Sequence, residues 1–155
     1  MDIQLISAAD HIDILRTLFR EYEAFLGVDL CFQSFDAELR TLPGKYAEPK
    51  GKCYLALCDS EAAGCIALRP IDNSVCEMKR LFVREKFRGH GIGEMLAEKV
   101  ISAAKEIGYQ TMRLDTLESL TSAVALYRKL GFVQIDPYYQ NPCEGVVYLE
   151  LPLNE

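Results

Sequence analysis

MKRLFVREKFRGHGIG, residues 78–93, is the stretch of this chain that decides its fold. Its first six residues predict an apolar strand, and its glycine-rich end leads into an amphipathic helix expected at 91–107. Glycine has no Cβ, so the backbone at this junction can approach a ligand closely. The N–H groups of the first helical turn lack partners within the helix and favour an anion. The junction therefore predicts a pyrophosphate site.

The spacing of the glycines separates the nucleotide-binding motifs that share this arrangement. A P-loop needs Lys-Ser or Lys-Thr at its end, whereas Gly93 is followed by Glu94-Met95. A dinucleotide fingerprint reads G-x-G-x-x-G, and this chain reads G-x-G-x-G. Asp115 nevertheless lies at the end of the next predicted strand, where a ribose-binding acid is expected. A dinucleotide-binding domain therefore stays open as an alternative.

Length and composition indicate a single globular domain over residues 1–155. No apolar run approaches the roughly 18–20 residues of a membrane span, so we expect no membrane partner. The opening residues Met1-Asp2-Ile3 lack the basic and apolar regions of a signal peptide. The chain is therefore expected to be cytoplasmic.

The cysteines and charges narrow the ligands further. With no C-x-x-C and only two histidines, the six cysteines are expected to be buried free thiols and not metal ligands; they lie at positions 31, 53, 58, 65, 76 and 143. A net charge of −6 argues against nucleic acid as a partner. Cations nevertheless gather beside the glycine loop, which suits a small polyanion. They are Lys79, Arg80, Arg84, Lys86 and Arg88.

Hydrophobic periodicity predicts the order β-α-α-β-β-β-α-β-α-β-β, an α/β or α+β mixed sheet whose antiparallel strands come first. Ser7, with Asp10 three residues later, is expected to cap the first helix, which ends at Gly27. The expected strands are 3–6, 53–58, 64–68, 75–83, 112–116, 132–135 and 146–151. The other expected helices are 34–41, 91–107 and 120–130, and a loop is expected at 43–52.

A second motif, AVALYRKLGF at 123–132, follows one predicted strand later. It resembles the A-x-x-L-Y-x-K-x-G-F signature of the GNAT superfamily of N-acetyltransferases, as R-x-x-G-x-G at 88–93 resembles that family's acyl-CoA loop. The order of elements is similar too. The resemblance is specific over 75–135, and it implies a GNAT-like acyl-CoA N-acyltransferase fold whose mostly antiparallel central sheet is flanked by helices.

The resemblance also implies where acetyl-CoA binds. Backbone groups of Leu81, Phe82 and Val83 would pair with the pantetheine arm, and Ser119, Ser122 and Tyr127 would lie along its other side. The chain departs from the family at Leu120, where the family often has asparagine. The backbone N–H groups that would hold the pyrophosphate are those of Arg88, Gly89, His90, Gly91, Ile92 and Gly93.

Acetyl transfer to an amine sets three requirements. The amine must be neutral, the oxyanion must be stabilised, and the leaving thiolate must be protonated. A backbone N–H of the 81–83 strand is expected to stabilise the oxyanion. Tyr127 is the candidate general acid, and Glu77, through water, is the candidate base.

The acceptor is the least determined part of the prediction. We expect direct transfer to a primary amine of a small molecule, such as an amino acid or a polyamine. Acetylation of a protein amine and a non-catalytic acyl-CoA-binding regulatory module stay open, as does a homodimer. Aromatic and polar residues of the early helices and of the segment 137–142 are expected to wall the acceptor pocket. They are Tyr22, Phe25, Phe32, Phe35, Tyr46, Tyr138, Tyr139 and Asn141.

Overall fold

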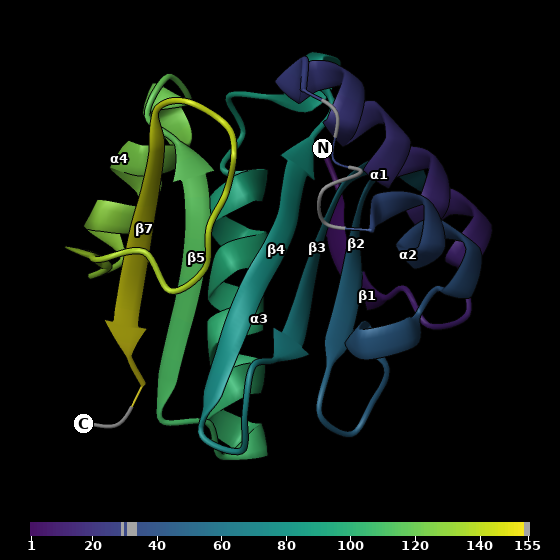
Figure 1. Ribbon diagram of the computed structural model, residues 1–155. Coiled ribbons are helices and arrows are strands. Elements are labelled where there is room, and N and C mark those ends of the chain that lie inside the picture. Colours follow the sequence, from purple (N-terminus) through teal and green to yellow (C-terminus); the bar gives the residue numbers. More distant parts are fainter. Residues whose placement is uncertain (29, 31–33, 154–155) are drawn as a thin grey trace.

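A computed structural model of the chain describes residues 1–28, 30 and 34–153. Within these residues, seven strands form one mixed sheet in the order β1-β2-β3-β4-β5-β7-β6 (Figure 1). The strands are β1 (Ile3–Ser7), β2 (Lys52–Cys58), β3 (Glu61–Pro70), β4 (Val75–Val83), β5 (Thr111–Leu117), β6 (Val133–Ile135) and β7 (Val146–Pro152). The α-helices are α1 (Ile12–Leu26), α2 (Phe35–Thr41), α3 (Ile92–Ile107) and α4 (Thr121–Lys129), and single 3₁₀ turns lie at Gly44–Tyr46 and Glu85–Phe87.

The predicted order of elements and the mixed sheet are confirmed. The predicted cap of the first helix is wrong. The helix begins at Ile12, one turn later than a cap at Ser7 would place it, and its N-cap is His11 without a side-chain cap. The Ser7 hydroxyl instead accepts a hydrogen bond from the Ala9 N–H, so it stabilises the turn before the helix.

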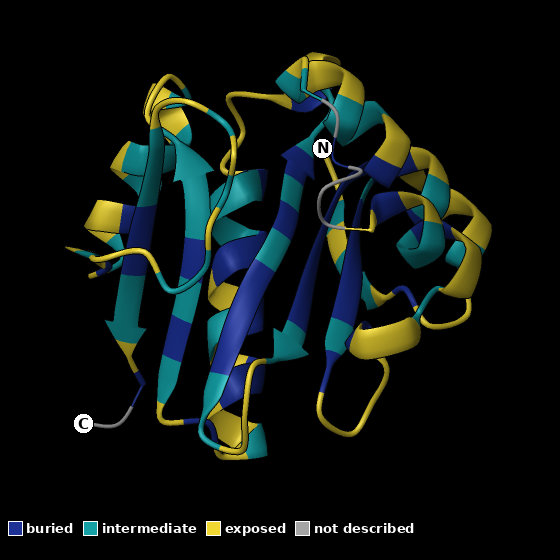
Figure 2. Ribbon diagram, in the orientation of Figure 1, coloured by how far each residue is buried: buried dark blue, intermediate teal, exposed yellow. Residues whose placement is uncertain are grey.

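The helices cover the two faces of the sheet and bury two apolar clusters. α3 lies behind the sheet in Figure 1, and its stripe of Ile92, Leu96 and Val100 packs against β2, β3 and β4. α1 and α2 lie on the opposite face. There Leu15 and Leu18 of α1, together with apolar residues of α2, pack on β2 and β3. Figure 2 shows the result, with buried residues concentrated along the central strands and exposed residues along the outer faces of α1 and α2.

The sheet is split between β4 and β5. These strands pair in parallel only from Val75 opposite Thr111 to Glu77 opposite Arg113. Beyond that point β4 remains paired with β3 and β5 with β7, and the two strands separate toward the top of Figure 1. The split exposes the inner edges of both strands, where a ligand can lie between them.

A β-bulge bends β4 beside the split. Cys65 pairs with Phe82 and Ala67 with Lys79, so β4 carries one more residue than β3 across this interval. Arg80 lies in the bulge and has a left-handed backbone conformation, with φ 62°. This conformation costs a residue with a side chain about 1–2 kcal/mol. Its guanidinium donates two hydrogen bonds to Glu38 of α2, at 3.0 and 2.9 Å. The ion pair thus holds the bulged residue in place.

None of the helices among the described residues combines the length and the apolarity needed to cross a membrane.

Replacing Glu38 by Gln is expected to lower the free energy of unfolding by about 3 kcal/mol, because a buried guanidinium loses its counter-charge. The side chains of Arg80 and Glu38 are only 3% and 17% exposed. Urea denaturation measures the change. The matched control is Glu61→Gln in the exposed pair of Lys86 and Glu61, which is expected to stay within about 1 kcal/mol of wild type. Equal losses in the two variants would contradict the role given to the Arg80–Glu38 pair.

Candidate active site

The split between β4 and β5 opens into a cavity of about 520 Å³. One wall is the outer half of β4 with the glycine loop, and the other is the end of β5 with the first turns of α4. Tyr22, Phe25 and Leu26 of α1 close a third side. The cavity therefore joins the N-terminus of α3 to the face of the sheet on which α1 and α2 lie.

The glycine loop has the geometry that the sequence predicts for an anion site. Gly89 and Gly91 have φ of 86° and 77°, which side-chain-bearing residues rarely adopt, and Gly91 is the N-cap of α3. A Cβ on either residue would meet nothing within 4 Å, so the backbone is open to a ligand there. The first helical N–H groups of α3 start at this point, beside the cavity.

Most of the predicted cofactor residues line this cavity. They are Leu81, Phe82, Val83, Arg88, Gly89, Gly91, Ile92, Gly93, Ser119 and Ser122. His90 is exposed and does not belong to the wall. The Arg88 N–H is engaged with the Glu85 carbonyl at 3.2 Å, so it does not join the loop's anion-binding groups. Ser119 lies in the turn before α4, which begins at Thr121 and not at 120 as predicted.

The five cations near the glycine loop have different partners, and only some of them line the cavity. Arg84 pairs with Glu21 at 2.8 Å, and Lys86 pairs with Glu61 at 2.8 Å. Arg88 lies over the ring of Phe25, 4.6 Å from its centroid, and donates to the Val83 carbonyl at 2.9 Å. Of the five cations, Lys79, Arg80 and Arg88 line the cavity.

Tyr127 lines the cavity from α4 and is buried against Phe132, with ring centroids 5.7 Å apart. Burial raises the pKa of its phenol above the ordinary value, and the negative charge of Asp115 acts in the same direction. The hydroxyl therefore stays protonated at neutral pH, as a proton donor must.

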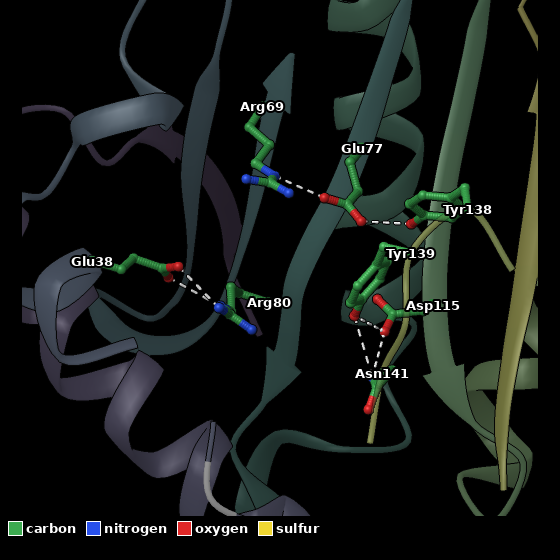
Figure 3. A network of polar contacts seen from close by, with 8 residues as sticks. All are labelled: Glu38, Arg69, Glu77, Arg80, Asp115, Tyr138, Tyr139 and Asn141. Carbon is green, nitrogen blue, oxygen red and sulfur yellow. Dashed lines mark hydrogen bonds and ion pairs between the residues drawn. The ribbon is translucent and has the colours of Figure 1, made fainter. Parts of the chain in front are cut away.

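Glu77 is fully buried and lies outside the cavity wall. Its Oε1 accepts a hydrogen bond from Arg69 at 2.7 Å and its Oε2 one from the Tyr138 hydroxyl at 2.5 Å (Figure 3). Burial alone would raise the pKa of this carboxyl, but Lys79, Arg69 and the Tyr138 bond outweigh it, and the pKa lies below its usual range. Glu77 is thus an ionised, fully engaged carboxylate, and its role as a base stays a prediction.

Asp115 is a cavity carboxylate to which the sequence pattern assigned no catalytic role. Among the described residues, both of its hydrogen bonds fall on Oδ2, from the Tyr139 hydroxyl and from Asn141 Nδ2, the latter at 2.8 Å (Figure 3). Tyr138, Tyr139 and Asn141 belong to the predicted aromatic segment, whose backbone is held by the Tyr148 hydroxyl. The unusually aromatic composition of that segment was the only sequence signal for this contact.

The residues expected to wall an acceptor pocket separate into three groups. Tyr22, Phe25 and Asn141 line the cavity. Tyr138 and Tyr139 stand behind its wall, bonded to Glu77 and Asp115. Phe35 and Tyr46 belong to the core beneath α1 and α2. Phe32 lies outside the residues that the structure describes, as does Cys31.

Comparison with known proteins places this geometry among acetyltransferases. The model of the acetyltransferase (GNAT) family matches residues 13–132. An uncharacterized N-acetyltransferase of Schizosaccharomyces pombe is 38% identical over 157 residues, which cover all of this chain and 96% of that protein.

Two solved structures share the fold. A GNAT-family acetyltransferase of Staphylococcus aureus superposes with a TM-score of 0.80 at 23% identity, covering 99% of this chain and 100% of that one. A GNAT-family acetyltransferase of Elizabethkingia anophelis, solved with acetyl-CoA bound, is 32% identical with a TM-score of 0.58, covering 66% of this chain and 76% of that one.

Replacing Gly93 by Val is expected to weaken acetyl-CoA binding on the order of tenfold. A Cβ at this position would lie 3.9 Å from both Leu126 and Val83, two cavity residues, so the branched side chain would occupy the space between the walls. Calorimetric titration measures the affinity. Ser102→Val, on the exposed side of the same helix, is the matched control and is expected to bind as wild type does. Undiminished affinity in the Gly93 variant would exclude this end of the cavity as the cofactor site.

Proposed function

This chain belongs to the GNAT family of acetyltransferases and depends on acetyl-CoA, and we propose that it transfers the acetyl group directly to a primary amine of a small molecule. The observation that carries the proposal is the course of the cavity. Its lining extends from the glycine loop, along the split in the sheet, to an end formed by Tyr22, Lys79, Arg80, Asp115 and Asn141, which we call the acceptor chamber. The glycine-loop end suits the acyl donor and the acceptor chamber suits an acceptor.

The residues of the split fit acetyl-CoA. The inner edge of β4 at Leu81–Val83 offers backbone groups to an extended arm, the glycine loop offers N–H groups to phosphate, and Ser119 and Ser122 line the facing wall. When bound, acetyl-CoA supplies an activated acyl group as a thioester. The chain's own residues then have to orient the amine, stabilise charge and move two protons.

The acceptor chamber is compact, which favours a small amine over a protein segment. The segment 136–145 crosses in front of β5 and β7 in Figure 1 and is tied to β4 through Tyr138 and to β5 through Tyr139 and Asn141. On the facing wall, Glu38 of α2 fixes the side chain of Arg80. These connections leave a bounded space rather than an open groove.

The chemistry follows from the positions of the wall residues. The neutral amine nitrogen forms a bond to the acyl carbon, and the bond from that carbon to sulfur breaks. A β4 backbone N–H at 81–83 would stabilise the negative charge that develops on the acyl oxygen. Tyr127 would give its proton to the leaving sulfur, and the proton lost by the amine would pass to solvent or to a carboxylate. We assign Glu77 a positioning role in place of the predicted role as a base, because both of its oxygens are bonded and its bond to Tyr138 fixes the segment that covers the acceptor.

The five described cysteines are free thiols, four of them buried, which suits a reducing compartment and supports a cytoplasmic location.

The direct test is release of free thiol from acetyl-CoA in the presence of pooled amines: amino acids, polyamines, aminoglycosides and a lysine peptide. Release above the hydrolysis background with a small-amine pool is expected, and mass spectrometry of the product identifies the acceptor. Release only with the peptide would overturn the small-molecule assignment. Tight acetyl-CoA binding without release from any pool would overturn the catalytic proposal.

Tyr127→Phe is expected to lower kcat on the order of 100-fold while the Kd of acetyl-CoA stays within about twofold of wild type, because only the proton donor is lost. Tyr54→Phe, on the α3 face away from the cavity, is expected to retain wild-type kcat. Because burial raises the pKa of Tyr127, titration of this phenol should not lower the wild-type kcat, measured at saturating acceptor, below about pH 10. An unchanged kcat in Tyr127→Phe would remove this residue from the mechanism.

A further inference from the structure

The acceptor end of the cavity carries charges of opposite sign on separate walls. Lys79 and Arg80 line it from β4, whereas Asp115 lines it from β5. Figure 3 shows Arg80 beside Glu38 on one side of β4, and Asp115 with Asn141 on the other. The strands separate between them, so charges of both signs face the same cavity.

The cationic wall is held rigidly. Arg80 is 4% exposed, its guanidinium is fixed by two bonds to Glu38, and its charge lies 5.1 Å from the centroid of the Phe35 ring. Lys79 stands beside it, half-buried. Burial, and then the positive charge of Arg80, lower the pKa of Lys79 to about 8 despite the nearby carboxylates. At neutral pH Lys79 is still mostly protonated, so this wall presents a cation to the cavity.

The anionic wall is equally fixed. The Tyr139 hydroxyl and Asn141 hold Asp115 from the covering segment. Glu77 is buried behind the wall and bonded to Arg69 and Tyr138, and Glu38 is bonded to Arg80, so neither belongs to the cavity wall. Asp115 is therefore the carboxylate that an ammonium group in the chamber would meet.

We propose that the acceptor is an amine that also carries a carboxylate, of the α-amino acid class, with its carboxylate at Lys79 and Arg80 and its amino group toward Asp115. This inference rests on the proposed function and narrows its substrate. The arrangement disfavours two other classes of amine. A polyamine would place a second cation against Lys79 and Arg80, and a lysine side chain of a protein has no carboxylate beside its amino group.

Matched acceptors test the inference. Each amino acid is compared with its own α-carboxamide in the thiol-release assay, so that the pair shares a side chain and differs in the negative charge; the amide's amine has the lower pKa, which on its own would favour the amide. We expect kcat/KM to be at least about tenfold higher for the acid of the preferred pair. A second readout needs no turnover: the melting temperature of the CoA-loaded protein is expected to rise with the acid and not with the amide.

Variants test whether the charge of Lys79 causes the preference for the acid over the amide. Lys79→Gln is expected to remove most of the discrimination between acid and amide through KM, with the Kd of acetyl-CoA unchanged. Lys79→Arg, which keeps the charge, is expected to retain the discrimination. The matched control Lys45→Gln removes an exposed lysine outside the cavity and is expected to behave as wild type. Asp115→Asn is expected to lower kcat/KM for acid and amide alike, because both carry the ammonium group.

The outcomes separate the two proposals. Equal acetylation of acids and amides, or full discrimination in Lys79→Gln, would overturn the carboxylate assignment and leave the proposed function standing. Acetylation of no amine at all would overturn the proposed function. In that case equal stabilisation of the CoA-loaded protein by acid and amide would overturn the carboxylate subsite as well, whereas stabilisation by the acid alone would support it.

Discussion

The early end of the pairing between β4 and β5 is the constraint on which the rest of the structure depends. Three residue pairs join these strands. Beyond these pairs, the residues 78–83 of β4 and 114–117 of β5 line the cavity. The sheet stays intact because β3 and β7 supply the outer hydrogen bonds. A single backbone irregularity, the bulge at Arg80, lies on the wall of the opening. The ion pair with Glu38 links that irregularity to α2, so a helix outside the cavity wall also stabilises the strand that forms one side of the cavity.

The two faces of the sheet differ in composition and in role. The α3 face is apolar and packed, and it provides the rigid support that a precise site needs. The opposite face combines an apolar half under α1 with a charged half beyond it, where arginines of β3 and β5 pair with acids of β4 and β7. Ion pairs of this kind contribute little net stability, and the Arg69–Glu77 pair fixes the carboxylate that binds Tyr138 of the covering segment. The same network that orders the covering segment also sets the signs of charge in the chamber.

Local patterns accounted for the parts of the molecule that are themselves local. The glycine loop, the stripe of α3 and the end of the first helix at Gly27 each depend on residues within one or two turns, and each was predicted. The contacts of Glu77 and Asp115 were not. The bonds of Glu77 to Tyr138 and of Asp115 to Tyr139 join residues 61 and 24 positions apart, so no local periodicity predicts them. The positive φ of Arg80 also lacks a sequence signal, because it is imposed by the strand partner and by Glu38. Ser7 shows the converse, a good local cap signal that a competing turn overrides.

Because the proposed acetyl-CoA site lies between the open inner edges of β4 and β5, the stability of the folded chain is expected to depend on the supply of acetyl-CoA. Unpaired strand edges invite association with other chains and open more readily than paired ones. A ligand that fills the gap between them binds the folded state and not the unfolded one. At a concentration of about one hundred times its dissociation constant, such a ligand adds about 2.7 kcal/mol to stability. In a cell rich in acetyl-CoA the protein is therefore expected to resist proteolysis and aggregation, and in a starved cell to be lost sooner.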